Sequence, residues 1–153
     1  MLEMEQIANS AIEVARKHIA DGEENLPMWF VPGEGRMNVI CTPFGDVSEK
    51  QNAEAFVRSK LEEWGSDWYV FLSEAWAVSR PVGSNPSNVI PSEADDRIEV
   101  LMIHGVHRDG TRFHWSYKII RSGEKPTLSE REDHSKGEHL GRFVDLFGPT
   151  ARH

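Results

Sequence analysis

Hydrophobic positions along this chain change period several times, and each period predicts a type of element. Residues 3–20 repeat apolar side chains about every 3.6 residues, which is typical of an amphipathic helix, and Asp21-Gly22 supplies its end. Residues 48–64 repeat the pattern and stop before Gly65, with Asp46 or Ser48 as the helix cap. The expected core faces are Ile7, Ala11, Val14, Ala15 and Ile19 in the first helix and Ala53, Phe56, Val57, Leu61 and Trp64 in the second.

Strand patterns occupy much of the remaining chain. Residues 28–31 and 37–43 predict two strands around a glycine turn at 32–36, which lacks the Gly-Lys-Ser/Thr ending of a phosphate loop. Residues 67–79 predict a longer strand in which Glu74 and Trp76 share a face with Val70 and Leu72. Because its opposite face is also mostly apolar, we expect helices on one side and another cover, such as a second subunit, on the other.

Residues 97–121 predict a hairpin, because two strand-like runs flank a central Asp109-Gly110. A two-residue turn there would place His104 opposite Trp115 and Val106 opposite Phe113 on a core face. The other face would carry the polar positions of both strands. These are Glu99, His107, Arg112, His114, Ser116 and Lys118, together with Leu101, Ile103, Gly105 and Ile120.

The segments outside these elements are polar. Residues 80–96 hold three prolines, two asparagines and three serines, so they predict a long loop that is either functional or disordered. Residues 122–138 predict a second polar segment, and residues 140–147 a short helix that docks Leu140, Phe143, Val144 and Phe147. The predicted fold class is α+β in a single domain, 1–153, with a five-stranded, mainly antiparallel sheet and the order α-β-β-α-β-β-β-α.

Composition narrows the function classes. A formal net charge of -8 opposes the phosphate backbone of nucleic acids, so nucleic-acid binding is not expected. Apolar runs are too short to cross a bilayer and the N-terminus has no signal pattern, so a cytoplasmic protein is expected. Cys41 is the single cysteine, which excludes an internal disulfide and favours a small buried side chain. No cofactor is expected.

Glu74 is the most unusual residue, because alternation places its carboxylate among apolar neighbours where it needs a partner. Arg97 and His104 are the candidate partners, and a structural ion pair is the favoured interpretation. Contact with a ligand and general acid/base catalysis by Glu74 are the alternatives.

Histidines suggest a metal site only weakly. His104 and His107 are three residues apart in a strand and therefore face opposite ways. His107 and His114 would share a face across the predicted hairpin, where they could hold a ligand, a proton or a metal ion. A solvated polar face with His104 as a core residue is the favoured interpretation.

The string Phe-Leu-Ser-Glu-Ala-Trp at 71–76, followed by Pro-Ser-Glu at 91–93 and Asp-Arg-Ile-Glu-Val at 96–100, resembles a pattern of small uncharacterised bacterial and phage proteins. The order of elements resembles the roadblock and profilin-like folds. The resemblance implies no catalytic residues, but it marks the same loop-flanking positions as the alternation does. The expected ligand or partner contacts are Glu74, Trp76, Arg80, Pro91, Ser92, Arg97 and Glu99.

Two functional hypotheses follow. The first is a non-enzymatic binding or accessory module that acts through protein–protein contact or self-association, with an exposed tryptophan near the loop as an anchor. The alternative is a small hydrolase or ligand-converting enzyme that uses Glu74 or Glu99 with His104, or the pair His107 and His114. A small-molecule ligand is compatible with either.

Overall fold

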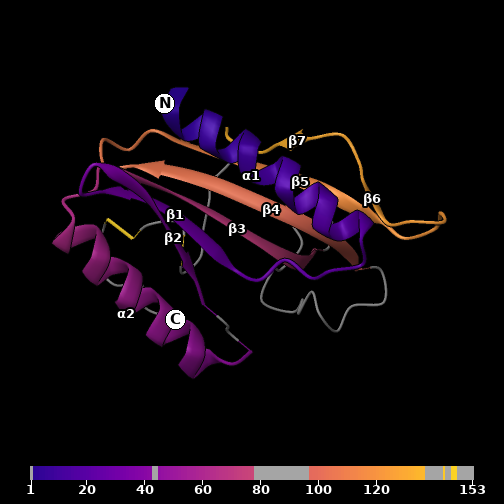
Figure 1. The fold of residues 1–153 in the computed structure, drawn as a ribbon, viewed down its shortest axis with the longest axis horizontal. Helices are drawn as coiled ribbons and strands as arrows, with labels where there is room; N and C mark the ends of the chain where they lie inside the picture. The colour runs from indigo at the N-terminus through magenta and orange to yellow at the C-terminus, as the bar shows by residue number, and fades with distance from the viewer. Residues whose placement is uncertain (1, 43–44, 78–96, 137–142, 144–145, 148–153) are drawn as a thin grey trace, which may run out of the picture.

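The computed structural model describes residues 2–42, 45–77, 97–136, 143 and 146–147, which form two helices and one antiparallel sheet (Figure 1). The sheet order is β2-β1-β3-β4-β5-β6, and β7 also pairs with β5. The bounds are α1 Leu2–Ala20, β1 Met28–Gly33, β2 Arg36–Cys41, α2 Val47–Glu63, β3 Trp68–Ala77, β4 Ile98–His107, β5 Arg112–Ile120, β6 Thr127–Leu128 and β7 Glu132–Asp133. The α+β class and the antiparallel sheet are confirmed.

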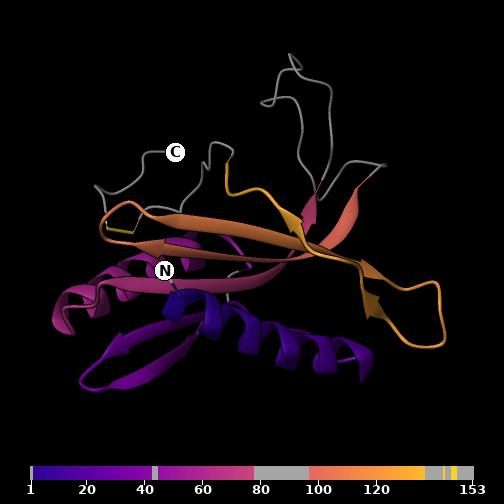
Figure 2. The ribbon, with the colours of Figure 1, turned by 90° about the horizontal axis from the view of Figure 1, so that it is seen from above.

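The two helices lie on opposite faces of the sheet (Figures 1 and 2). On one face, α1 buries its apolar side chains against β3, β4 and β5, with Val70 and Leu72 among its partners. On the other face, α2 packs over β1 and β3 and meets Tyr69 and Phe71. The predicted alternation of β3 is therefore confirmed, because adjacent residues enter different cores. We call these faces the α1 face and the α2 face.

The ends of α2 follow local chemistry. The Asp46 carboxylate accepts a hydrogen bond from the Glu49 backbone N–H at 2.8 Å, which satisfies one of the free amides of the first turn. The helix stops where Gly65 adopts a positive φ of 58°, a conformation that glycine tolerates without steric cost. Both predicted end signals are confirmed.

Both faces of β3 are covered by other parts of the same chain. Residues 69–72 of β3 are each at most 1% exposed, because α1 covers one face and α2 covers the other. Phe143, Leu146 and Phe147 add to the α2 face, so the predicted docking of Phe143 and Phe147 is confirmed. The second subunit suggested as one possible cover of β3 is therefore not required there. Leu140 and Val144 lie outside the described residues.

The β4–β5 hairpin is displaced by one residue from the predicted register. Arg108, Asp109 and Gly110 form a three-residue loop, in which Gly110 has a φ of 96°. The Asp109 carboxylate accepts a hydrogen bond from the Thr111 N–H at 2.8 Å, and Asp109 does not take the positive φ that a two-residue turn requires. Ladder pairing therefore joins Gly105 with Phe113, His104 with His114 and Ile103 with Trp115. The predicted pairs of Val106 with Phe113 and His104 with Trp115 are wrong.

A one-residue slip exchanges the two faces of a strand. Leu101, Ile103 and Gly105 consequently join the apolar face of β5 under α1, whereas they were expected on the polar face. The sheet also exceeds the five predicted strands, because β6 and β7 form within the polar segment 122–138. Residues 143 and 146–147 are not helical, so the short third helix is not found in the described part of that segment. No described helix is long and apolar enough to span a bilayer.

Candidate functional site

Glu74 finds its partner in the connector between α1 and β1. Its Oε2 atom accepts two hydrogen bonds from Asn25, one from the backbone N–H at 2.5 Å and one from the side-chain amide at 3.1 Å. Asn25 is only 3% exposed, and its amide oxygen lies 3.1 Å from His18 Nδ1. The expectation of a partner for Glu74 is confirmed, but Arg97 and His104 are not that partner in the described contacts. The carboxylate thus fastens the connector to β3.

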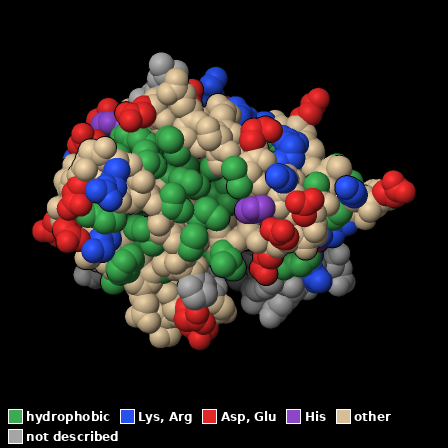
Figure 3. Space-filling view, viewed as in Figure 1, with side chains coloured by type: hydrophobic (Ala, Val, Ile, Leu, Met, Phe, Trp, Pro, Cys, Tyr) green, Lys and Arg blue, Asp and Glu red, His purple; other side chains and the backbone are tan. Residues whose placement is uncertain are grey.

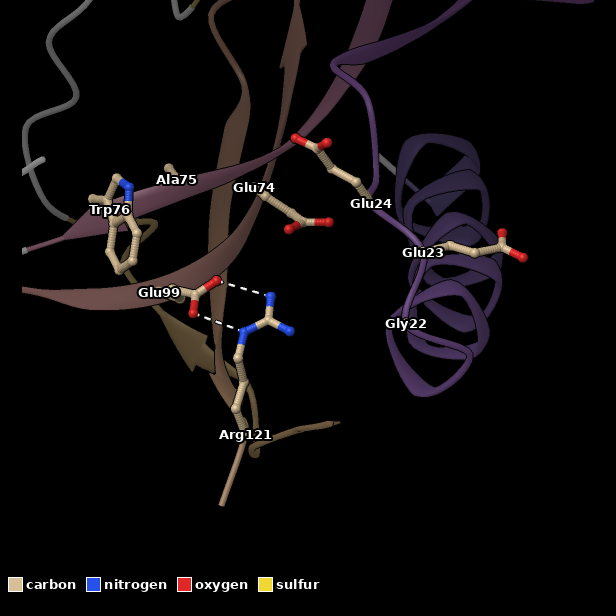
Figure 4. Close-up of a pocket in the computed structure, with 8 residues that line it drawn as sticks. All are labelled: Gly22, Glu23, Glu24, Glu74, Ala75, Trp76, Glu99 and Arg121. Carbon is tan, nitrogen blue, oxygen red and sulfur yellow. Dashed lines mark hydrogen bonds and ion pairs between the residues drawn. The ribbon is translucent and has the colours of Figure 1, made fainter. Parts of the chain in front are cut away.

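Glu74, Trp76 and Glu99 line one polar pocket of about 400 Å³ (Figure 4). The remaining lining residues are Gly22, Glu23, Glu24, Ala75 and Arg121. We call this the carboxylate pocket, because four glutamates and one arginine supply its charged groups. Figure 4 shows the Glu74 carboxylate and the Arg121 guanidinium extending toward the same space. The pocket therefore presents an excess of negative charge to any bound group.

Arg121 and Glu99 form an ion pair in the lining of this pocket. Arg121 donates from Nε to Glu99 Oε1 at 2.7 Å and from Nη2 to Oε2 at 2.9 Å, a bidentate geometry that fixes both side chains. These hydrogen bonds lower the pKa of the Glu99 carboxyl and raise the pKa of Arg121, against a smaller opposing effect of burial. Glu99 is consequently held as a carboxylate and is poorly suited to act as a general acid.

Trp76 stands at the mouth of the carboxylate pocket with 42% of its surface exposed. The Arg97 guanidinium lies 4.6 Å from the centre of its ring, within the range of a cation–π contact. The structure thus brings together four of the predicted contact residues: Glu74, Trp76, Arg97 and Glu99. Arg80, Pro91 and Ser92, with the rest of loop 80–96, lie outside the described residues.

His104 belongs to the α2 face and is separated from the carboxylate pocket by the sheet. It is 2% exposed, packs on Phe71 with ring centres 5.2 Å apart, and its Nε2 lies 2.9 Å from the Phe143 carbonyl oxygen. Its predicted role as a core residue is confirmed. The pairing of His104 with Glu74 or Glu99 that the enzyme hypothesis needs is not formed.

His107 and His114 do not share a face either. The shifted register pairs His114 with His104, with ring centres 5.8 Å apart, and leaves His107 beside Asp109 at the turn. The diagonal pair predicted from the two-residue turn is therefore wrong. Among the residues that the structure describes, no three His, Cys, Asp or Glu side chains converge as metal ligands.

A second depression lies on the α1 face, between α1 and the β1–β2 hairpin. It has a volume of about 430 Å³ and is lined almost entirely by apolar side chains. We call it the apolar groove; its lining consists of Ile7, Ser10, Ala11, Val14, Ala15, Asn25, Met28, Phe30, Met37, Val39 and Leu72. Figure 3 shows the hydrophobic patch on this side of the molecule, with charged side chains around its rim. Val14 and Val39 on its borders are 55% and 54% exposed.

The groove arises because α1 covers only part of the sheet. The helix packs over β3, β4 and β5, so no described helix lies above the α1 faces of β1 and β2 (Figure 2). The apolar stripe of α1 is wider than its contact with the sheet, and Val14, expected in the core, borders the groove instead. The wide apolar stripe of α1 was visible in the sequence. Only the position of the helix over the sheet shows that part of this stripe borders a groove.

The apolar groove and the carboxylate pocket adjoin each other at Asn25. Asn25 lines the groove, and its hydrogen-bond acceptor Glu74 lines the pocket. Neither Asn25 nor Arg121 was identified from the sequence. Arg121 follows Ile119 by two positions and so continues the same face of β5, which the correct register would have placed near Glu99. The two depressions are therefore neighbours on the α1 face, linked by the hydrogen bonds between Asn25 and Glu74.

Comparison of the chain with models of protein families, with curated proteins and with solved structures finds no match.

Proposed function

We propose that this protein is a binding module that docks a segment of a partner protein in the apolar groove and a basic group of that segment in the carboxylate pocket. The observation that carries the proposal is the groove itself. It leaves Val14 and Val39 more than half exposed on a face where the flanking part of α1 is buried. Apolar depressions with a polar rim are typical of interaction sites.

The charge of the adjoining pocket specifies the partner further. Its lining holds Glu23, Glu24 and Glu74 but one cation, Arg121, which Glu99 already pairs. A lysine or arginine placed next to apolar anchors would complement this charge, whereas an acidic segment would be repelled. The Trp76 ring at the pocket mouth supplies a flat aromatic surface of the kind that binding hot spots use.

Groove occupancy is expected to contribute useful affinity. Full burial of a valine or leucine side chain contributes about 1.5–3 kcal/mol, so covering the exposed halves of Val14 and Val39 would contribute about 1.5–3 kcal/mol together. The anchors of the partner segment would add a similar amount from their own surface. Together these contributions support a transient, selective contact rather than an obligate one.

A displayed library of random peptides, selected against the purified protein, tests the proposal. We expect the enriched peptides to combine apolar residues with lysine or arginine. Val14→Glu should weaken the best peptides about tenfold or more, because it places a charge in the groove wall. Val47→Glu is the matched control, since Val47 is 61% exposed but lies on α2, on the opposite face. Equal binding by both variants would remove the groove from the proposal.

The charge component is tested separately with the double variant Glu23→Gln and Glu24→Gln. Both residues are exposed members of the pocket lining, so the fold should be retained. The variant should weaken a selected peptide that carries its basic residue and should leave unchanged the same peptide with glutamine there. An equal loss for both peptides would show that the pocket does not recognise the basic group.

A further inference from the structure

β2 lies at one edge of the described sheet. Among the described strands only β1 pairs with it, in a register that joins Val31 with Asn38 and Gly33 with Arg36. The tight turn at Glu34-Gly35 makes Gly33 and Arg36 a hydrogen-bonded pair, and the Thr42 N–H donates to the Pro27 carbonyl at 3.2 Å. By this alternation the backbone groups of Met37, Val39 and Cys41 point away from β1. They form a row of donors and acceptors available to another strand.

This edge carries few of the features that protect an open edge strand from pairing. Natural edges are commonly protected by lysine, proline, bulges or inward-pointing charges. β2 has the sequence RMNVIC, in which Arg36 at its beginning is the single charged residue. Apolar side chains lie beside the edge on both faces, next to the polar Arg36, Asn38 and Thr42 on the α2 face. Val39 borders the apolar groove on the α1 face, and Phe56 of α2, 48% exposed, shares a depression with Thr42 on the other.

We propose that β2 pairs with β2 of a second copy of this chain, so that the two sheets join antiparallel across a two-fold axis at Val39. This arrangement goes beyond the proposed function and does not depend on it. Centred on Val39, the pairing places Met37 opposite Cys41 of the second copy and Arg36 opposite Thr42 of the second copy. All three outward-pointing backbone positions then find hydrogen-bond partners.

Charge favours a second copy over an unrelated extended segment. Arg36 is two residues from Asn38 and four from the buried Ile40, so its exposed side chain lies on the α2 face. On that face Thr42 lines a depression together with Glu49. The two-fold pairing therefore brings Arg36 of each copy to Glu49 of the other, twice in the same interface. The chain itself supplies a strand of matching length and charge.

Native mass measurement at micromolar concentrations is the first test. We expect a dimer of twice 17.4 kDa for the unmodified protein. Val39→Pro removes the central outward N–H, leaves the pairs with β1 intact and should give a monomer with an unchanged circular dichroism spectrum. Val39→Thr keeps the N–H and the β-branched shape and should remain dimeric. A monomeric unmodified protein, or a dimeric Val39→Pro variant, would overturn the proposal, and the first result would leave the edge to a foreign peptide.

A charge exchange tests the contact between copies. Arg36→Glu and Glu49→Arg should each weaken the dimer roughly tenfold or more, because like charges then meet twice across the axis. The double variant should recover most of the affinity, which a purely structural effect on each copy would not produce. A double variant weaker than either single variant would refute the contact.

Cysteine cross-linking tests the register. In a variant with Val39→Cys and Cys41→Ser, paired Cα atoms about 5.5 Å apart satisfy the distance that a disulfide needs, so oxidation should give a covalent dimer. The native Cys41 lies four residues from its copy in this register, about 13 Å, and should not cross-link. The reverse pattern would move the axis and overturn the arrangement. Val14→Glu should leave the mass unchanged, which separates a failure of the groove from a failure of this interface.

Discussion

Replacement of Glu74 separates its role in holding the fold from any role in binding. Both hydrogen bonds from Asn25 end on one atom, Glu74 Oε2, at 2.5 and 3.1 Å. Glu74→Ala deletes this acceptor and leaves the backbone N–H and side-chain amide of the buried Asn25 without it. Glu74→Gln retains an oxygen that can accept from both donors. The two variants therefore differ in the acceptor, while both remove the charge.

The expected magnitudes follow from these contacts. A hydrogen bond to a charged group contributes about 1.5–3 kcal/mol, and a buried donor left unsatisfied costs about 1–3 kcal/mol. Because Glu74 is partly exposed and water can enter, we expect Glu74→Ala to lower the free energy of unfolding by about 2–4 kcal/mol. Glu74→Gln should cost less than about 1 kcal/mol. For a chain of this size the alanine variant should melt about 5–15 °C lower.

Urea unfolding, followed by tryptophan fluorescence, measures both changes. The midpoint should fall while the slope of free energy against urea stays constant, since the native fold is retained. Glu23→Ala, an exposed glutamate of the same pocket, should change stability by less than about 0.5 kcal/mol. Equal losses for Glu74→Ala and Glu74→Gln would refute the reasoning, because the charge rather than the acceptor atom would then fasten Asn25.

Two further predictions concern the sheet and the ion pair. Gly105→Ala would place a Cβ atom 2.7 Å from Phe113 Cζ, so we expect thermal unfolding to show a loss of stability of about 2–3 kcal/mol. Gly123→Ala is the control and should have little effect, because its Cβ atom would make an ordinary contact at 3.6 Å. Arg121→Ala tests the lowered pKa of Glu99. The ion pair stabilises the folded protein at pH values above the ordinary pKa of 4.5, and this stabilisation is lost as the pH falls through the lower pKa of the folded state. On acidification from pH 7 to 3 the unmodified protein should therefore lose up to about 1 kcal/mol more stability than the variant. Identical pH profiles for the two proteins would contradict that ion pair.

Part of the candidate site could be predicted from local pattern. Alternation in β3 placed Glu74 and Trp76 on one face, and the cost of an unpaired carboxylate among apolar residues required a partner for Glu74. The structure supplies that partner from Asn25, 49 residues away in sequence. No periodicity links the two positions, because the connector after α1 reaches β3 only through the packing of α1 on the sheet.

The hairpin shows why the candidate histidine cluster could not be predicted. Asp109-Gly110 signalled the turn correctly, but the turn type depends on whether Asp109 takes a positive φ. Its side chain instead accepts a hydrogen bond from Thr111, which stabilises a three-residue loop. The resulting shift of the strand register by one residue decided which face of the sheet each histidine occupies.

The sequence by itself determined the position and type of both helices and of the main strands, the capping of α2 and the alternation of β3, because these depend on interactions between residues close in the chain. Tertiary structure alone decided which part of the sheet α1 covers, and with it the apolar groove and the carboxylate pocket. It also decided that α2, with Phe143, Leu146 and Phe147, covers the second face of β3. These features depend on which parts of broad apolar surfaces come into contact when the helices pack on the sheet. Hydrophobic attraction has no direction, so several placements satisfy the same pattern until the whole core is assembled.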